Sequence, residues 1–256
     1  MRPPIVALLT DFGLKDPYVG LMKGVLLTVQ PDARIVDLSH DIAPQAVLDA
    51  QRVLSQACGF FPKGTIFVAV VDPGVGSSRA ILGVETERHV FLAPDNGLLS
   101  FVEKARRIVR IENERYFLKP VSDTFHGRDI FAPVAGHLAR GLDLGRLGPR
   151  IGSIERLRPP APRVTPTGDV VGEVMAVDRF GNLVTNIPAQ RLARVSEIRL
   201  KRHRIARLLR TYAEARRGDL FGIVGSTGHL EISVNRGSAA RKTGAAVGDP
   251  VRVKPA

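Results

Sequence analysis

The stretch TIFVAVVDPGVGSSR, residues 65–79, joins the most apolar strand-like run of the chain to a polar loop rich in glycine. A short, uniformly apolar run is typical of a strand that is buried on both faces of a sheet. The loop places Asp72 and Arg79 directly after this strand. Because ligands of open α/β sheets bind just beyond the carboxyl ends of the strands, the stretch predicts an α/β domain with a site at this loop.

Strand-like and helix-like segments alternate around this stretch. The strand-like runs are 5–10, 33–40, 80–87 and 89–94, and the helix-like runs are 18–30, 47–61, 96–105 and 127–141. Such alternation, with apolar strands, predicts a largely parallel sheet that is flanked by helices on both faces. We therefore expect an N-terminal α/β domain over residues 1–150.

The composition changes after this domain. Five of the 18 prolines lie between positions 149 and 166, which is typical of a stiff linker, here placed at 151–167. Beyond it, short strand-like runs are separated by Gly and Asn. This pattern predicts a smaller C-terminal domain over residues 168–256, built as an antiparallel sheet or barrel.

The composition is that of a globular protein with a core, since 44% of the 256 residues are hydrophobic and 24% are charged. No run of about 18 apolar residues is present, so no membrane-spanning segment is expected. The short apolar stretch near the N-terminus does not fit a signal peptide. The single Cys58 excludes an internal disulfide, and the six histidines form no HxxxH or HxH pair. We expect a cytoplasmic protein without a metal or a cofactor.

The net charge of +12 is concentrated in residues 191–217, which hold ten Arg or Lys against two Glu. An arginine-rich, solvated face is the simplest interpretation of this segment. A site for a polyanion is the alternative, but no series of aromatic residues offers a stacking platform between the charges. Nucleic acid is therefore not an expected partner.

Three polar loops are candidates for one site: TDFG (10–13), VDPGVGSSR (71–79) and SDTFHGRD (122–129). Each has charged residues at a place where the sheet interior ends, and each has glycine, which allows close backbone approach. Simpler interpretations exist for each, because Asp11 can cap a helix, Asp72 can form a turn and His126 can lie on a surface loop. The G-x-G-x-x-G, Walker and G-x-S-x-G motifs are missing, so a phosphate cradle or a nucleophile elbow is not indicated.

The C-terminal domain contains DRFGNLVTN (178–186) and GSTGHLEI (225–232). The Phe180 ring beside Gly181 and the amide of Asn182 offer a purine a stacking surface and hydrogen bonds to its edge. An Asx-type turn between two strands is the alternative for the same residues.

These motifs occur in one order along nearly the whole chain. The order is TDFG, DPYVGLMKGVL, IVDLSHDI, VAVVDPGVGSSR, APDNGLL, TFHGRDIFAPVAGHLA, DRFGNLVTN and STGHLEISVN. In this the chain resembles the S-adenosylmethionine (SAM) hydroxide adenosyltransferases, or adenosine-forming SAM hydrolases, which are similar in fold to the SAM-dependent fluorinase and chlorinase. The resemblance implies the conversion of SAM and water into adenosine and methionine. It also implies a C-terminal β-barrel and a homotrimer with the ligand between subunits.

The resemblance assigns roles to residues of the N-terminal domain. The catalytic Asp, Arg and His of the family correspond to Asp72, Arg79 and His126. The aspartate that binds the ribose corresponds to Asp11, and the one that contacts the methionine part corresponds to Asp16.

In the C-terminal domain, Asp178 and Ser226 match contacts of the methionine head group. Phe180 and Asn182 match the adenine site, and Tyr212 falls where the halogenases place an aromatic residue near the purine. Two positions depart from the halogenases, which have Tyr in place of Asp72 and Trp in place of Gln45. These departures argue against a halide-using enzyme, which remains one alternative, and a non-catalytic nucleoside or SAM-binding protein is the other.

The residue types fit this chemistry. The sulfonium of SAM makes the 5′ carbon electrophilic, and a neutral thioether leaves without the help of an acid. Water is a weak nucleophile, so a fixed cation and a base must favour hydroxide where no metal does so. Arg79 can supply the permanent charge, His126 can accept a proton near neutral pH, and Asp72 can orient either of them.

Overall fold

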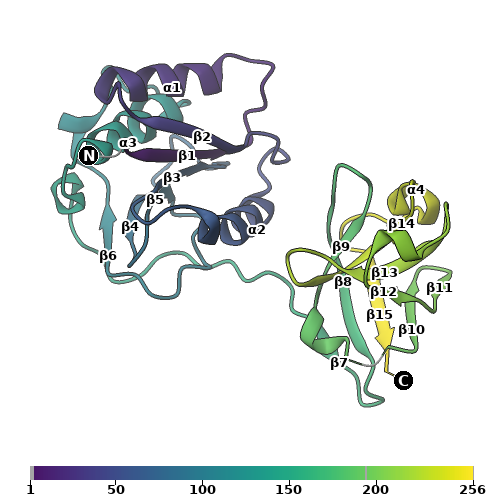
Figure 1. The fold of residues 1–256 in the computed structure, drawn as a ribbon. Helices are drawn as coiled ribbons and strands as arrows, with labels where there is room; N and C mark the ends of the chain where they lie inside the picture. Colours follow the sequence, from purple (N-terminus) through teal and green to yellow (C-terminus); the bar gives the residue numbers. More distant parts are fainter. Residues whose placement is uncertain (1–2, 194, 256) are drawn as a thin grey trace. The chain divides into compact units, whose positions relative to one another are not determined.

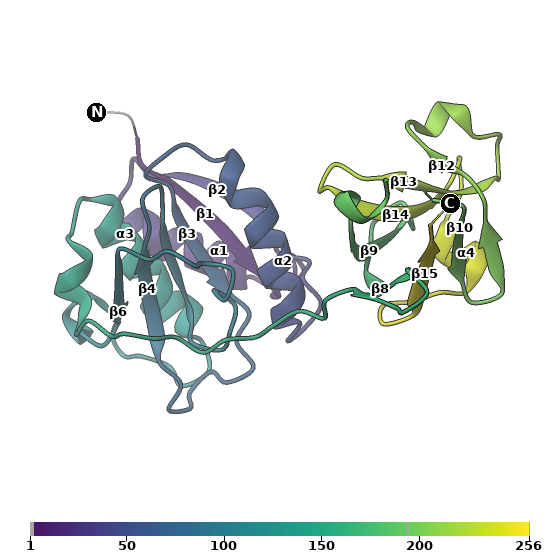
Figure 2. The same cartoon turned by 90° about the horizontal axis from the view of Figure 1, so that it is seen from below.

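The computed structural model describes residues 3–193 and 195–255. These residues form two compact units that divide between Arg158 and Pro159. Each unit has its own sheet, as Figures 1 and 2 show, and its own buried hydrophobic clusters. Within the described residues, no helix has the length and apolar character needed to cross a membrane.

The first unit contains six strands and three α-helices. The strands are β1 (Ile5–Thr10), β2 (Arg34–Ser39), β3 (Ile66–Val70), β4 (Ile81–Glu85), β5 (Val90–Pro94) and β6 (Arg107–Arg110). The helices are α1 (Tyr18–Val29), α2 (Val47–Ala57) and α3 (Ala132–Ala139), and a π-helical turn (Gly127–Phe131) leads into α3.

The six strands form one sheet in the order β2-β1-β3-β5-β4-β6. Strands β2, β1, β3 and β5 are adjacent in this order and pair in parallel, whereas β4 is antiparallel to both β5 and β6. The sheet is therefore mixed. The reason is the short connection between β4 and β5, because a few residues can close a hairpin but cannot make the crossover that parallel strands require.

Alternate residues of the central strands face two separate cores. Val6 and Leu8 of β1 pack in a cluster with Met22 of α1 and Val134 of α3, while Ala7 and Leu9 pack in a second cluster with Leu54 of α2. Helices α1 and α3 thus cover one face of the sheet and α2 covers the other (Figure 1). This two-sided burial explains why the central strand β3 is apolar at every position.

The prediction of a helix over residues 96–105 is wrong, since the chain there forms turns and irregular structure. The side chain of Asn96 accepts a hydrogen bond from the Leu98 backbone, and Gly97 has a positive φ of 91°. Local bonds of this kind compete with the start of a helix. Leu98 and Leu99 are buried as part of a turn instead.

The second unit contains nine strands and one short helix. The strands are β7 (Arg163–Val164), β8 (Val170–Val177), β9 (Leu183–Pro188), β10 (Glu197–Leu200), β11 (His203–Ile205), β12 (Leu208–Leu209), β13 (Leu220–Val224), β14 (His229–Val234) and β15 (Pro250–Lys254). The helix is α4 (Ala239–Thr243).

These strands pair along one path, β11-β10-β15-β8-β9-β14-β13-β12, with β7 paired to β8. Every pairing is antiparallel except that of β12 with β13. The path bends back on itself, because β11 contacts β13 and a Cβ on Gly222 would come within 2.5 Å of Ile198. The sheet is therefore nearly barrel-shaped, with most of the buried hydrophobic residues in one cluster.

The arginine-rich segment 191–217 supplies part of that core. Ile198 and Leu200 of β10 are fully buried, while the charged residues between and beside them lie closer to solvent. Several of these charges are paired, as in the contacts of Arg199 with Glu197 and of Lys201 with Asp249. Strand β10 is thus half-buried, with its apolar side chains in the core and its charged side chains closer to solvent.

Candidate active site

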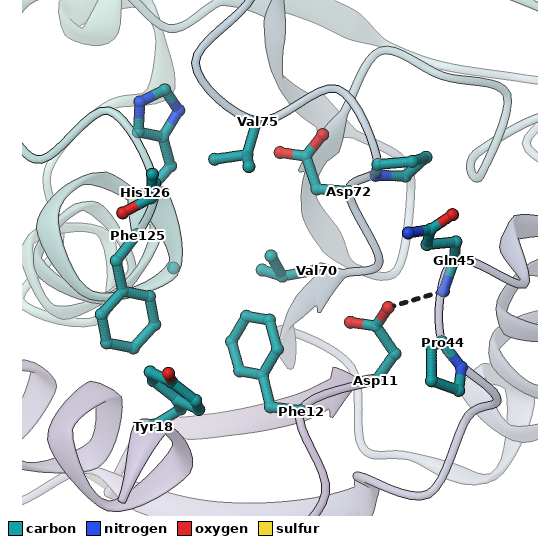
Figure 3. A pocket seen from close by; sticks show the side chains of 13 residues that line it. Asp11, Phe12, Tyr18, Pro44, Gln45, Val70, Asp72, Val75, Phe125 and His126 are labelled. Atoms are coloured by element: carbon teal, nitrogen blue, oxygen red, sulfur yellow. Dashed lines mark hydrogen bonds between the residues drawn. The ribbon is translucent and has the colours of Figure 1, made fainter. Parts of the chain in front are cut away.

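A cavity of about 420 Å³ opens at the carboxyl ends of β1 and β3. Its walls come from the loops after β1, β2 and β3 and from the loop that precedes α3. Figure 3 shows Asp11 and Asp72 on one side of it, and Phe125 and His126 on the other. The volume is within the range typical of small-molecule sites. The three loops that the sequence nominated therefore do meet at one place.

Arg79 is held by two partners from different loops. Its Nε donates to Asp72 Oδ1 at 3.0 Å, and its Nη2 donates to Asp72 Oδ2, which makes a two-point ion pair. Nη2 also lies 2.9 Å from Nδ1 of His126. The side chains of Asp72 and Arg79 are only 4% and 10% exposed. A guanidinium fixed in this way is a pre-oriented positive charge next to the cavity.

Two glycines allow the loops to approach this closely. A Cβ on Gly76 would lie 2.4 Å from the backbone oxygen of Asp123, and Gly76 has a positive φ of 77°. A Cβ on Gly127 would lie 3.2 Å from both Met22 and the Phe12 ring. Glycine at these positions brings the loop of Arg79 against the loop of His126, and brings the latter against the loop of Asp11.

The Arg79 contact also fixes the protonation state of His126. A guanidinium can only donate, so Nδ1 must accept and the proton of the neutral ring must lie on Nε2. Burial of the ring, followed by the charge of Arg79, lowers the pKa of His126 below its ordinary 6.5, although Asp72 acts in the opposite direction. The imidazole is therefore neutral at neutral pH.

Asp11 is bound to the loop that follows β2. Its Oδ2 accepts a hydrogen bond from the backbone N–H of Gln45 at 2.8 Å, the dashed line in Figure 3. Gln45 has a φ of 66°, a left-handed conformation that is unusual for a residue with a side chain. The two loops are also joined behind the cavity, where Thr10 Oγ1 lies 2.8 Å from Nδ1 of the buried His40. Asp11 thus stabilises a strained wall of the cavity through its Oδ2, and its Oδ1 accepts no hydrogen bond from the residues that the structure describes.

One wall of the cavity is aromatic and was not predicted from the sequence. Phe12, Tyr18 and Phe125 pack edge to face in a triangle with ring centroids 5.1–6.0 Å apart. Phe12 directly follows Asp11, and Phe125 directly precedes His126. Their position next to two predicted site residues could have indicated that they line the cavity.

In the second unit, four residues that the sequence pointed to form one hydrogen-bonded group. Asp178 Oδ1 accepts from the backbone N–H groups of Phe180 and Asn182, and its Oδ2 accepts from the Asn182 amide at 2.9 Å. The same amide lies 3.4 Å from the Tyr212 hydroxyl. Asp178 therefore closes the Asx-type turn between β8 and β9 that was the alternative interpretation. The Phe180 ring is 77% exposed on this turn.

Two nominated residues lie apart from these groups. Asp16 is exposed before α1 and does not line the cavity of the first unit. Ser226 is exposed in the turn between β13 and β14. Beside it, a Cβ on Gly225 would meet the Glu231 carboxylate, and both burial and the charge of Asp178 raise the pKa of Glu231. Glu231 was not nominated from the sequence.

Within residues 3–193 and 195–255, no group of three or more His, Cys, Asp or Glu side chains is arranged to hold a metal ion.

The fold and the cavity define a two-unit protein whose α/β unit carries a candidate small-molecule site beside a hydrogen-bonded Asp–Arg–His group. Residues 6–148 match the family model of the SAM hydroxide adenosyltransferase N-terminal domain, and residues 172–252 match that of the C-terminal domain. The chain belongs to the SAM hydroxide adenosyltransferase family.

Individual relatives agree with this assignment. An (R)-S-adenosyl-L-methionine hydrolase of Thermus thermophilus is 39% identical, over 99% of this chain and 100% of the relative. A solved structure of an uncharacterized conserved protein from Thermotoga maritima is 40% identical, with a TM-score of 0.89 over 97% of this chain and 100% of that one. A fluorinase of Nocardia brasiliensis is more distant, at 28% identity over 99% of this chain and 97% of the relative.

Proposed function

We propose that this protein hydrolyses SAM to adenosine and L-methionine. In the reaction an oxygen of water or hydroxide forms a bond to the 5′ carbon while the bond from that carbon to sulfur breaks. The sulfonium takes the bonding electrons and leaves as the neutral thioether of methionine, and the proton of the water passes to solvent. The observation that carries the proposal is the hydrogen-bonded Asp72–Arg79–His126 group, in which Asp72 and His126 line the same cavity as Asp11, in a member of this family.

In this proposal Arg79 is the electrostatic centre of the site. Asp72 and His126 engage its Nε and Nη2 atoms, so the remaining N–H groups on Nη1 are the donors left for the attacking oxygen. A fixed positive charge in a partly dry cavity favours hydroxide over water. Because Nδ1 of His126 faces Arg79, the imidazole takes up the water proton only if that contact opens. Its role in the closed arrangement is to orient the guanidinium.

Asp11 is the proposed ribose ligand. Its Oδ2 is already bound to Gln45, and its Oδ1 can accept hydrogen bonds from the vicinal hydroxyls. The aromatic wall of Phe12, Tyr18 and Phe125 keeps water away from the other faces of the sugar, and it limits competing reactions.

The remaining assignments rest on the family resemblance. We propose that Phe180, Asn182 and Tyr212 serve the adenine, and that Asp16, Asp178 and Ser226 serve the methionine part. A homotrimer with the ligand between subunits, a C-terminal barrel, a cytoplasmic location and a reaction without a metal or cofactor belong to the same proposal.

The test is product analysis. Purified protein is incubated with SAM in the presence and absence of fluoride or chloride, and the products are separated by chromatography and identified by mass. Adenosine and methionine in equal amounts, unaffected by halide, are expected. A 5′-halo-5′-deoxyadenosine product would favour the halogenase, and tight adenosine binding without methionine release would favour a binding protein.

A further inference from the structure

The turn that follows β5 lies under the loop that carries Asp72 and Arg79. This loop, residues 71–80, connects β3 to β4, but in the sheet β5 lies between those two strands. The carboxyl ends of β3 and β5 are at the same edge of the sheet, and β4 begins there because it runs antiparallel. The loop must therefore pass over the end of β5, where Asp95 and Asn96 leave the sheet.

Two successive residues of that turn bind the two ends of the loop. The Asn96 side chain donates from Nδ2 to the backbone oxygen of Val71 at 2.9 Å. The backbone N–H of Asp95 donates to the backbone oxygen of Ala80, also at 2.9 Å. Val71 directly precedes Asp72, and Ala80 directly follows Arg79.

Asn96 is itself held rigidly. Its Oδ1 accepts from the Leu98 backbone at 3.2 Å, and its own backbone N–H donates to Pro94. The next residue, Gly97, packs so closely on Leu157 that a Cβ would lie 2.4 Å from the Leu157 side chain. Val71 is completely buried, so its carbonyl depends on a protein donor rather than on water.

We propose that Asn96 is a positioning residue for catalysis, which sets the place of Asp72, and through it of Arg79, by its hydrogen bond to the Val71 carbonyl. Asp72 is the residue directly after Val71, whose carbonyl binds Asn96. Both carboxylate oxygens of Asp72 accept hydrogen bonds from Arg79. A displacement of about 1 Å in catalytic geometry can lower a rate by about 10²-fold. Asn96 does not line the cavity, so its effect falls on turnover rather than on substrate affinity. This role rests on the proposed function of the site.

Asn113 is a matched control. It too donates from Nδ2 to a backbone oxygen, that of Arg146 at 2.8 Å, and accepts at Oδ1 from the backbone two residues ahead, at 3.2 Å. Its bonds have the same pattern, but the chain that it ties down carries none of the Asp72–Arg79–His126 group.

The experiment compares wild type with Asn96→Ala, Asn96→Asp and Asn113→Ala. The Asp variant keeps the shape of the side chain and removes the donor, so it serves if the Ala variant does not fold. We expect both Asn96 variants to lose about tenfold or more in kcat, with KM for SAM and Kd for adenosine changed by no more than about twofold. Asn113→Ala should keep kcat within about twofold of wild type. Its loss of thermal stability should be the smaller one, because Arg146 is exposed whereas Val71 is buried.

A second readout does not depend on turnover. In Asn96→Ala the titration midpoint of His126, followed by NMR, should rise, because Arg79 no longer sits fixed against Nδ1. An active wild type with Asn96 variants that keep kcat, or that lose no more than Asn113→Ala, would overturn the role of Asn96. An unmoved His126 midpoint would overturn it as well. A wild type that does not hydrolyse SAM would instead refute the proposed function, and the NMR result would then decide on Asn96 alone.

Discussion

Arg79 and His126 are 47 positions apart in the sequence, yet Nη2 of Arg79 lies 2.9 Å from Nδ1 of His126. The contact joins the loop after β3 to the loop before α3, and it requires a neutral imidazole. Protonation of Nδ1 would put two donors and two positive charges against each other. The site is therefore sensitive to acid at this one bond.

The titration of His126 gives the first prediction. Burial and the charge of Arg79 lower the pKa of His126, so its NMR midpoint should lie below the ordinary 6.5. The pKa is lowered only in the folded state, so the unfolded chain binds the proton first. The free energy of unfolding therefore decreases as pH falls from 6.5 through the lowered midpoint. In Arg79→Gln the midpoint should move upwards, because the cation is gone and Asp72 remains. A midpoint that is the same in both proteins would show that the contact is not formed in solution.

The buried ion pair gives a second prediction. Asp72→Asn should leave the charge of Arg79 buried without its partner, at a cost of about 3 kcal/mol or more in the free energy of unfolding. The same variant should lower kcat about 10²-fold, as should Asp72→Ala, Arg79→Ala and His126→Ala. Denaturant unfolding and steady-state kinetics measure the two effects. Turnover close to that of wild type in these variants would rule out the proposed roles.

Asp11 should govern affinity rather than turnover. In Asp11→Asn the amide oxygen can still accept from the Gln45 backbone, so the wall of the cavity is kept while the charge is lost. Adenosine should then bind about tenfold more weakly, the effect of a hydrogen bond to a charged group, as measured by calorimetry. Asp41→Asn is the control, because Asp41 is exposed in the neighbouring loop after β2, which carries Gln45. Unchanged affinity in Asp11→Asn would mean that the ribose binds elsewhere.

The approach of two catalytic loops can be tested at a glycine. Gly76→Ala adds a methyl group that would lie 2.4 Å from Asp123, and should separate Arg79 from His126. Gly64→Ala is a matched control, since Gly64 also has a positive φ but nothing within 4 Å. Both variants should lose about 1 kcal/mol of stability from backbone strain. Only Gly76→Ala should lose activity, by about tenfold or more, and equal kinetics in the two variants would contradict the argument.

The place of the loops at 10–13 and 71–79 could be predicted, because both follow apolar strands and ligands bind at the carboxyl ends of such strands. The loop at 122–129 precedes α3 and follows no strand directly, so this rule does not place it. Other features depend on contacts that a linear pattern does not contain. The positive φ of Gln45 follows from its bond to Asp11 across 34 positions. The helical pattern of 96–105 gives way to a turn because Asn96 binds Val71 and Leu98 instead.

The second unit illustrates the same limit. The sequence indicated a polar group at Asp178 and Asn182. In the structure, both carboxylate oxygens of Asp178 accept hydrogen bonds from within the turn itself. Which neighbours satisfy a carboxylate is decided by backbone geometry, so residue type alone could not distinguish a ligand contact from an Asx turn.

The most direct test of the central claim is the source of the new oxygen. Wild-type protein is given SAM in heavy-oxygen water, and the adenosine formed is examined by mass spectrometry. We expect one heavy oxygen, at the 5′ position, and a rate about 10²-fold lower for Arg79→Ala. Adenosine without the heavy atom, or labelled adenosine formed equally fast by Arg79→Ala, would contradict attack by solvent at a site organised by this arginine.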